Sequence, residues 1–95
     1  MSQSLPSSTL TVYRREGCHL CDEARVMLQH ELEERAMRGE PTALVRELDI
    51  DADPDLHKRY FLRIPVFTID GLELDLVTSS RQVRVFIDRA LPRLA

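Results

Sequence analysis

The sequence predicts a small α/β domain, because segments with the period of a strand alternate with segments with the period of a helix. A β-branched and aromatic run at Thr9–Arg14 precedes a long helical stripe over 19–38. Two later apolar runs, 66–69 and 72–77, are joined by Asp70-Gly71, a dipeptide typical of a tight hairpin. We therefore expect the order β-α-β-α-β-β-α, with a four-stranded mixed sheet.

Length and composition indicate one ordinary soluble domain. The chain has 95 residues, 43% of them apolar and 31% charged, and its 3 Gly and 5 Pro exclude a collagenous or disordered chain. A net charge of -3 without a basic run argues against nucleic-acid binding. No apolar stretch is long enough for a membrane span or a signal peptide, so we expect a cytoplasmic monomer that does not bind membranes. Residues 1–8 are polar and predict a flexible tail before a domain over 9–95.

The first half of the chain has the pattern of a strand-helix-strand unit. Thr9–Arg14 has the composition of a central strand. Over 19–38 apolar residues recur at three- and four-residue spacing, and Gly39 and Pro41 end this helix. The segment 43–51 alternates as expected of a strand near a sheet edge. Such a unit predicts two parallel strands and a right-handed crossover. The stripe of the helix consists of Leu20, Ala24, Met27, Leu28, Leu32 and Ala36.

The second half predicts two helices around a hairpin. Asp53-Pro54 is an N-cap followed by proline at the first helical position, and it opens a short helix through Tyr60. Ile64-Pro65 ends any helix before the antiparallel strands at 66–69 and 72–77. Ser79 and Gln82 form a capping box for a last helix. Its apolar stripe is Val83, Phe86, Ile87, Ala90 and Leu91.

Both cysteines lie in the cluster Cys18-His19-Leu20-Cys21, at the start of the first predicted helix. Unpaired N–H groups and the helix dipole at such a position lower a cysteine pKa from about 8.5 to roughly 3.5–7.5. Cys21 shares the helix face of Ala24 and Leu28, so we expect it to be buried and to remain a thiol. Their spacing brings the Cα atoms within the roughly 4.4–6.8 Å that a disulfide requires. The pair can therefore close.

A redox-active pair explains this motif better than the alternatives do. A disulfide that encloses so short a loop adds little stability by chain entropy. A zinc site needs four ligands, but His30 and His57 lie in separate helices without a second paired motif. We therefore predict redox chemistry with no bound metal or organic cofactor, and keep a metal site and an inert thiol pair as alternatives.

The order of these elements, with Cys-x-x-Cys at the helix start and Ile64-Pro65 before the third strand, resembles the thioredoxin fold in its minimal glutaredoxin form. The chain is similar to small bacterial glutaredoxin-like proteins with Gly-Cys-x-Leu-Cys-Asp, here 17–22, and Tyr-x-x-Arg-Ile-Pro-Val, here 60–66. The resemblance covers nearly the whole chain. It implies a three-layer α/β/α domain that reduces protein or small-molecule disulfides, with catalytic residues Cys18 and Cys21.

The resemblance also implies substrate-binding residues. Ile64-Pro65 would be a cis peptide beside Cys18, with backbone groups of Ile64 free to pair with an extended substrate. Arg15, three residues before Cys18, would hold a glutathione carboxylate; the alternative is a solvated arginine at a strand end. His19 is either a local cation that activates Cys18 or a side chain that points into water.

Two positions depart from the glutaredoxin pattern. His19 and Leu20 replace a proline and an aromatic residue between the cysteines, and Thr-Ser-Ser at 78–80 replaces a Gly-Gly and Asp segment that contacts glutathione. The N–H groups before the last helix could receive a carboxylate, but we favour Ser79 as a simple helix cap. Glutathione and a separate disulfide reductase thus both remain candidates for the reductant that regenerates the dithiol. A thioredoxin-fold module that holds a metal or cluster, or only binds partners, is the alternative function.

Overall fold

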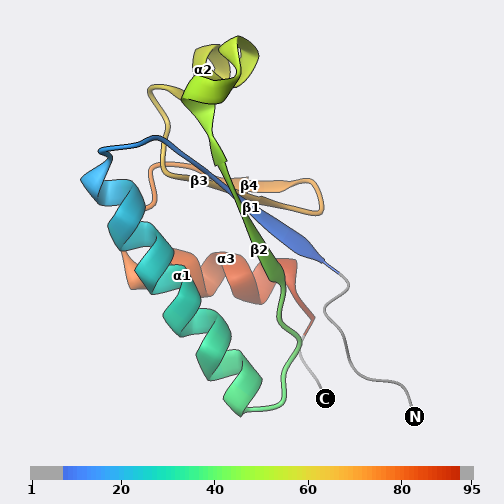
Figure 1. Ribbon diagram of the computed structural model, residues 1–95. Coiled ribbons are helices and arrows are strands. Elements are labelled where there is room, and N and C mark those ends of the chain that lie inside the picture. The colour runs from blue at the N-terminus through green and yellow to red at the C-terminus, as the bar shows by residue number, and fades with distance from the viewer. Residues whose placement is uncertain (1–7, 93–95) are drawn as a thin grey trace.

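Residues 8–92 are described by the computed structural model, and they form one four-stranded sheet and three α-helices (Figure 1). The strands are β1 (Thr9–Arg14), β2 (Leu44–Asp49), β3 (Val66–Ile69) and β4 (Leu72–Leu74). The helices are α1 (His19–Met37), α2 (Pro54–Tyr60) and α3 (Ser80–Ala90), with a short 3-10 helix, η1 (Ile50–Ala52), before α2. The predicted order is confirmed. The predicted tail lies outside the described residues, apart from Ser8.

The sheet has the strand order β2-β1-β3-β4. β1 pairs in parallel with β2 and antiparallel with β3, so β1 is interior and β2 lies at the edge, as predicted. β3 and β4 form the antiparallel hairpin. In its turn Asp70 and Gly71 have φ values of 49° and 83°, the positive values that a two-residue type I′ turn requires at both positions.

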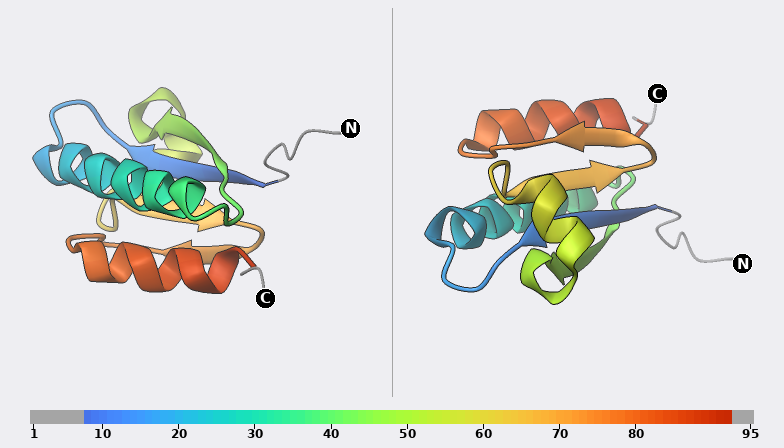
Figure 2. Two further views of the ribbon diagram at one scale, coloured as in Figure 1. Left: turned by 90° about the horizontal axis from the view of Figure 1, so that it is seen from below. Right: turned by 90° about the horizontal axis from the view of Figure 1, so that it is seen from above.

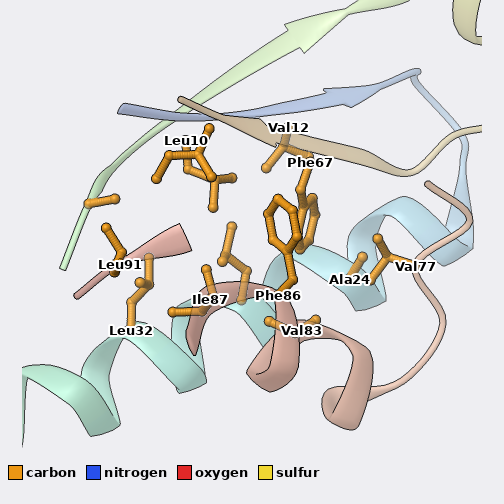
Figure 3. Close-up of a cluster of buried hydrophobic side chains, with 13 residues drawn as sticks. Leu10, Val12, Ala24, Leu32, Phe67, Val77, Val83, Phe86, Ile87 and Leu91 are labelled. Carbon is orange, nitrogen blue, oxygen red and sulfur yellow. The ribbon is translucent and has the colours of Figure 1, made fainter. Parts of the chain in front are cut away.

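Helices cover the two faces of the sheet unequally (Figure 2). α1 and α3 pack on one face and α2 on the other, which confirms the three-layer architecture. The alternation of side chains along β1 explains both layers, because Val12 points into the α1–α3 core and Tyr13 joins the α2 side. Figure 3 shows the larger core, which includes Leu10, Leu32, Phe67, Val83, Phe86 and Ile87. The smaller cluster contains Ile50, Tyr60 and Val66.

Two predicted strands end earlier than expected. The strand predicted over 43–51 stops at Asp49, whose side chain accepts the N–H of Asp51 at 2.9 Å and starts η1. The strand predicted over 72–77 stops at Leu74, because Leu76 takes a positive φ of 50° and breaks the extended conformation. After these breaks Ile50 enters the smaller core and Val77 the larger one, whereas Leu76 is exposed.

The end of α1 departs from its predicted apolar stripe. Ala36 is exposed, whereas Arg35 is completely buried. The Arg35 guanidinium donates to the carbonyl of Pro41 at 2.8 Å, to the carboxylate of Asp88 at 3.0 Å and to the carbonyl of Pro92 at 2.9 Å. These hydrogen bonds satisfy a charged group that could not otherwise be buried. They join α1 to α3 and to the segments that follow each helix.

Candidate functional site

Three segments that are far apart in the sequence meet at one end of the sheet (Figure 1). β1 and β3 run antiparallel with Tyr13 opposite Val66, so the turn after β1 and the loop before β3 lie at the same end. The segment after β4 joins them, because the N–H of Val77 donates to the carbonyl of Pro65 at 3.3 Å. The topology therefore places Cys18, Pro65 and the start of α3 at this end.

The two cysteines form a disulfide, with 5.2 Å between their Cα atoms. Cys18 is the N-cap of α1, and the N–H of Cys21 donates to its Sγ at 3.1 Å. Gly17 has a φ of 80°, which allows the tight turn from β1 into the helix. The prediction that this pair can close is confirmed.

The environments of the two sulfurs differ in the way that stepwise chemistry needs. Cys18 is half-buried, whereas Cys21 is 0% exposed. When the disulfide opens, the Cys21 N–H and the N-terminus of α1 favour a negative charge on the Cys18 Sγ. The acidic group in the first helical turn, Asp22, lies 3.4 Å from the Arg14 guanidinium, which offsets its charge. Cys18 is thus the accessible sulfur and Cys21 the protected one.

The Ile64-Pro65 peptide is cis, as the family resemblance implied, and Pro65 is buried. The expectation for Ile64 was wrong in one respect: its N–H donates to the Tyr60 carbonyl at 3.0 Å, in the turn that ends α2. Its carbonyl accepts no backbone N–H among the described residues. One of the two backbone groups expected to pair with a substrate is therefore already used.

Arg15 is paired within the chain. Its Nε and its terminal nitrogen lie 3.2 Å and 3.1 Å from the same carboxylate oxygen of Asp51. The other oxygen of Asp51 lies 3.6 Å from the Nε2 of His57. A carboxylate ligand would therefore have to compete with Asp51 for the Arg15 guanidinium.

His19 projects from the first turn of α1. Its side chain is 87% exposed, and its Nε2 lies 3.3 Å from the carboxylate of Glu23, one turn further along. This geometry favours the alternative in which His19 points into water.

The start of α3 is capped by its own side chains. Ser79 Oγ accepts the N–H of Gln82 at 3.2 Å. In return, Gln82 Oε1 accepts the N–H groups of Thr78 at 2.7 Å and of Ser79 at 2.9 Å. The predicted capping box is confirmed, and two of the donors that a carboxylate ligand would use there are already satisfied.

The model of the family described as Glutaredoxin-like domain matches residues 9–89. This chain belongs to that family. A structural genomics target protein from X. campestris is 35% identical with a TM-score of 0.69, over 85% of this chain and 97% of that one. A Nitrosomonas europaea protein is 26% identical with a TM-score of 0.62, over 90% and 98%. Oxidised thioredoxin from Plasmodium falciparum shares the fold, with 12% identity and a TM-score of 0.62 over 92% and 84%. No curated protein matches the chain.

Two contacts near the site of this glutaredoxin-like domain were not predicted from the sequence. Asp51 was assigned to a strand end, and its partner Arg15 lies 36 positions away. Gln82 was recognised as part of a helix cap, but not as the acceptor for Thr78. The spacing of Ser79 and Gln82 was a usable signal for the cap, whereas no local pattern connects Asp51 to Arg15.

Proposed function

We propose that this glutaredoxin-like domain is a thiol-disulfide oxidoreductase, with Cys18 as nucleophile and Cys21 as the resolving cysteine. The observation that carries the proposal is the disulfide at the N-terminus of α1, which joins a half-buried Cys18 to a fully buried Cys21. The family membership and the thioredoxin-like fold support the same chemistry.

The reaction proceeds by two exchanges. The Cys18 thiolate attacks one sulfur of the substrate disulfide; that S–S bond breaks, a mixed disulfide forms, and the released thiolate takes up a proton. Cys21 then loses its proton and attacks the Cys18 Sγ, which expels the second substrate thiolate. The substrate gains two electrons and two protons. The enzyme is left with the Cys18–Cys21 disulfide.

The substrates are protein or small-molecule disulfides, held beside Pro65. The carbonyl of Ile64 is the backbone group that accepts a hydrogen bond from an extended substrate, because the N–H of Ile64 is used by Tyr60. Two molecules of glutathione, or a separate disulfide reductase, return the enzyme to its dithiol form. The reaction needs no organic cofactor, because sulfur carries both electrons, and the reducing cytoplasm is the compartment that keeps such a dithiol active.

Substitution of each cysteine tests this function. In reduction of insulin or hydroxyethyl disulfide, Cys18→Ser should abolish turnover, because no thiolate remains to attack. Cys21→Ser should still attack and should accumulate the mixed disulfide, which mass spectrometry detects as an adduct on Cys18. Full activity of Cys18→Ser would contradict the assignment. An inactive unmutated protein would favour a binding module with the same fold.

Metal binding is distinguished by a separate measurement. The cysteine pair supplies two sulfur ligands, and residues 8–92 contain no group of three or more His, Cys, Asp or Glu arranged to hold a metal ion. A metal or cluster would therefore need further ligands, for example from a second copy of the chain. Stoichiometric zinc or iron in protein purified without chelator would favour this module over the oxidoreductase.

A further inference from the structure

Positive charges around the disulfide turn are compensated by carboxylates of the chain itself. Arg14 lies 3.4 Å from Asp22 and 3.6 Å from Glu47. The other basic side chains of this turn follow the same rule, since Arg15 pairs with Asp51 and His19 with Glu23. An anionic ligand that approaches the sulfurs therefore meets paired charges.

Among these pairs, the one between Arg15 and Asp51 is best placed to affect ligand choice. The carbonyl of Arg15 accepts the N–H of Cys18 at 3.3 Å, so Arg15 belongs to the turn that holds the nucleophile. Its Nε donates to one oxygen of Asp51, and a terminal nitrogen lies 3.1 Å from the same oxygen, so two nitrogens of the guanidinium face this carboxylate and not a ligand. Both side chains are accessible, at 44% and 42% exposure. Removal of Asp51 would leave this arginine open to a ligand.

We propose that Asp51 determines the thiol specificity of this site: by neutralising Arg15, it disfavours carboxylate-bearing thiols such as glutathione relative to uncharged thiols. The inference rests on the proposed function. Glutathione carries a net negative charge at neutral pH and must compete with Asp51 for Arg15. The capped start of α3 offers it no compensation at Thr78 and Ser79, whose N–H groups are occupied by Gln82.

The relevant reaction is reduction of the Cys18–Cys21 disulfide by two thiols. The first thiolate attacks Cys18, the intramolecular S–S bond breaks, and a mixed disulfide and the Cys21 thiolate form, the latter taking up a proton. The second thiolate attacks the sulfur of the first. This attack releases Cys18 as a thiolate and joins the two thiol molecules in a disulfide. The enzyme gains two electrons, which the two thiols lose.

The experiment measures the rate of this reduction with glutathione and with 2-mercaptoethanol, by quenching the reaction and alkylating the freed cysteines. We expect Asp51→Ala to raise the glutathione rate, relative to the 2-mercaptoethanol rate, roughly two- to fivefold at low salt, the range for one exposed ion pair. The gain should shrink at high salt because of screening. Asp51→Asn should show a smaller gain of the same sign, since its amide still accepts a hydrogen bond but carries no charge.

Two controls separate a local effect from a general one. Asp55→Ala removes the same charge from an exposed position on α2 and should leave the ratio of rates unchanged. The double variant Arg15→Ala/Asp51→Ala should return the ratio to that of Arg15→Ala alone. An unchanged ratio in Asp51→Ala, or an equal gain in Asp55→Ala, would overturn the inference. Failure of the proposed function is distinguishable from this, because a protein without redox function would not accelerate insulin reduction above the rate with either thiol alone.

Discussion

In the proposed function, Cys18 combines a structural and a chemical role in one residue. As the N-cap of α1 it occupies the position where serine or aspartate usually accepts a free backbone N–H, and its Sγ takes the Cys21 N–H at 3.1 Å. A group that accepts this hydrogen bond in the disulfide is in place to stabilise a thiolate after reduction. In the proposed reaction we therefore expect the start of α1 to be the group that favours the Cys18 thiolate.

We therefore expect His19 to have no part in activating Cys18. In reduced protein, His19→Ala should leave the pH profile of Cys18 alkylation by iodoacetamide unchanged, because the imidazole is 87% exposed and lies beside Glu23. Glu23→Ala, which frees the imidazole, is the matched control and should also leave the profile in place. A shift of the His19→Ala profile to higher pH would show that the imidazole supplies charge to the sulfur.

At the scale of elements, α3 depends on the chemistry of its first turn. The capping box between Ser79 and Gln82 satisfies N–H groups on both sides of the helix start. Gln82 also holds the segment that returns from β4, because its Oε1 accepts the N–H of Thr78. The N–H of the preceding residue, Val77, donates to the Pro65 carbonyl. The cap therefore stabilises one wall of the candidate site as well as the helix.

Ser79→Ala should lower the free energy of unfolding by about 0.5–2 kcal/mol, the usual cost of losing a serine cap. Urea denaturation followed by circular dichroism measures the change. Ser80→Ala is the control: it makes the same substitution one residue later, at an exposed position in the first helical turn, and should be nearly neutral. Equal losses in the two variants would show that the capping hydrogen bonds contribute nothing specific.

At the scale of the whole molecule, the two helices of one face are tied together at their ends by Arg35. It is buried completely and reaches Asp88 on α3 and the carbonyl of Pro92 beyond it. The carbonyl of Pro41 fixes the connection into β2. One side chain thus determines how α1, α3 and the sheet edge are joined far from the cysteines.

In residues 8–92, no helix is long and apolar enough to span a bilayer.

We expect Arg35→Ala to lower the free energy of unfolding by about 2–4 kcal/mol, because it leaves a cavity and several polar groups without their donor. Urea denaturation measures this loss. In the folded fraction, the reduction rate of the Cys18–Cys21 disulfide should equal that of the unmutated protein. Arg89→Ala, at an exposed position near the end of α3, is the matched control and should change stability by less than about 0.5 kcal/mol. A small effect of Arg35→Ala would show that the buried charge is easily replaced by water.

Local chemistry was sufficient to predict the order of the elements, the hairpin turn at Asp70-Gly71, the cap at Ser79 and the closable cysteine pair. Each of these depends on residues within a few positions of one another, where spacing alone decides which side chains meet. The cis state of Ile64-Pro65 followed only from the family resemblance, because the isomer of a proline peptide is decided by its surroundings.

The sequence by itself determined where the helices and most of the strands lie. It also determined that Cys18 lies at the start of a helix and that Cys21 follows one turn later. Only the tertiary structure decided which charges are paired. Arg15 meets Asp51 across 36 residues, and Arg35 meets Asp88 across 53, after the sheet and helices have packed. The physical reason is that a periodic pattern specifies which face of an element is buried, whereas a charge finds its partner only when distant faces come together.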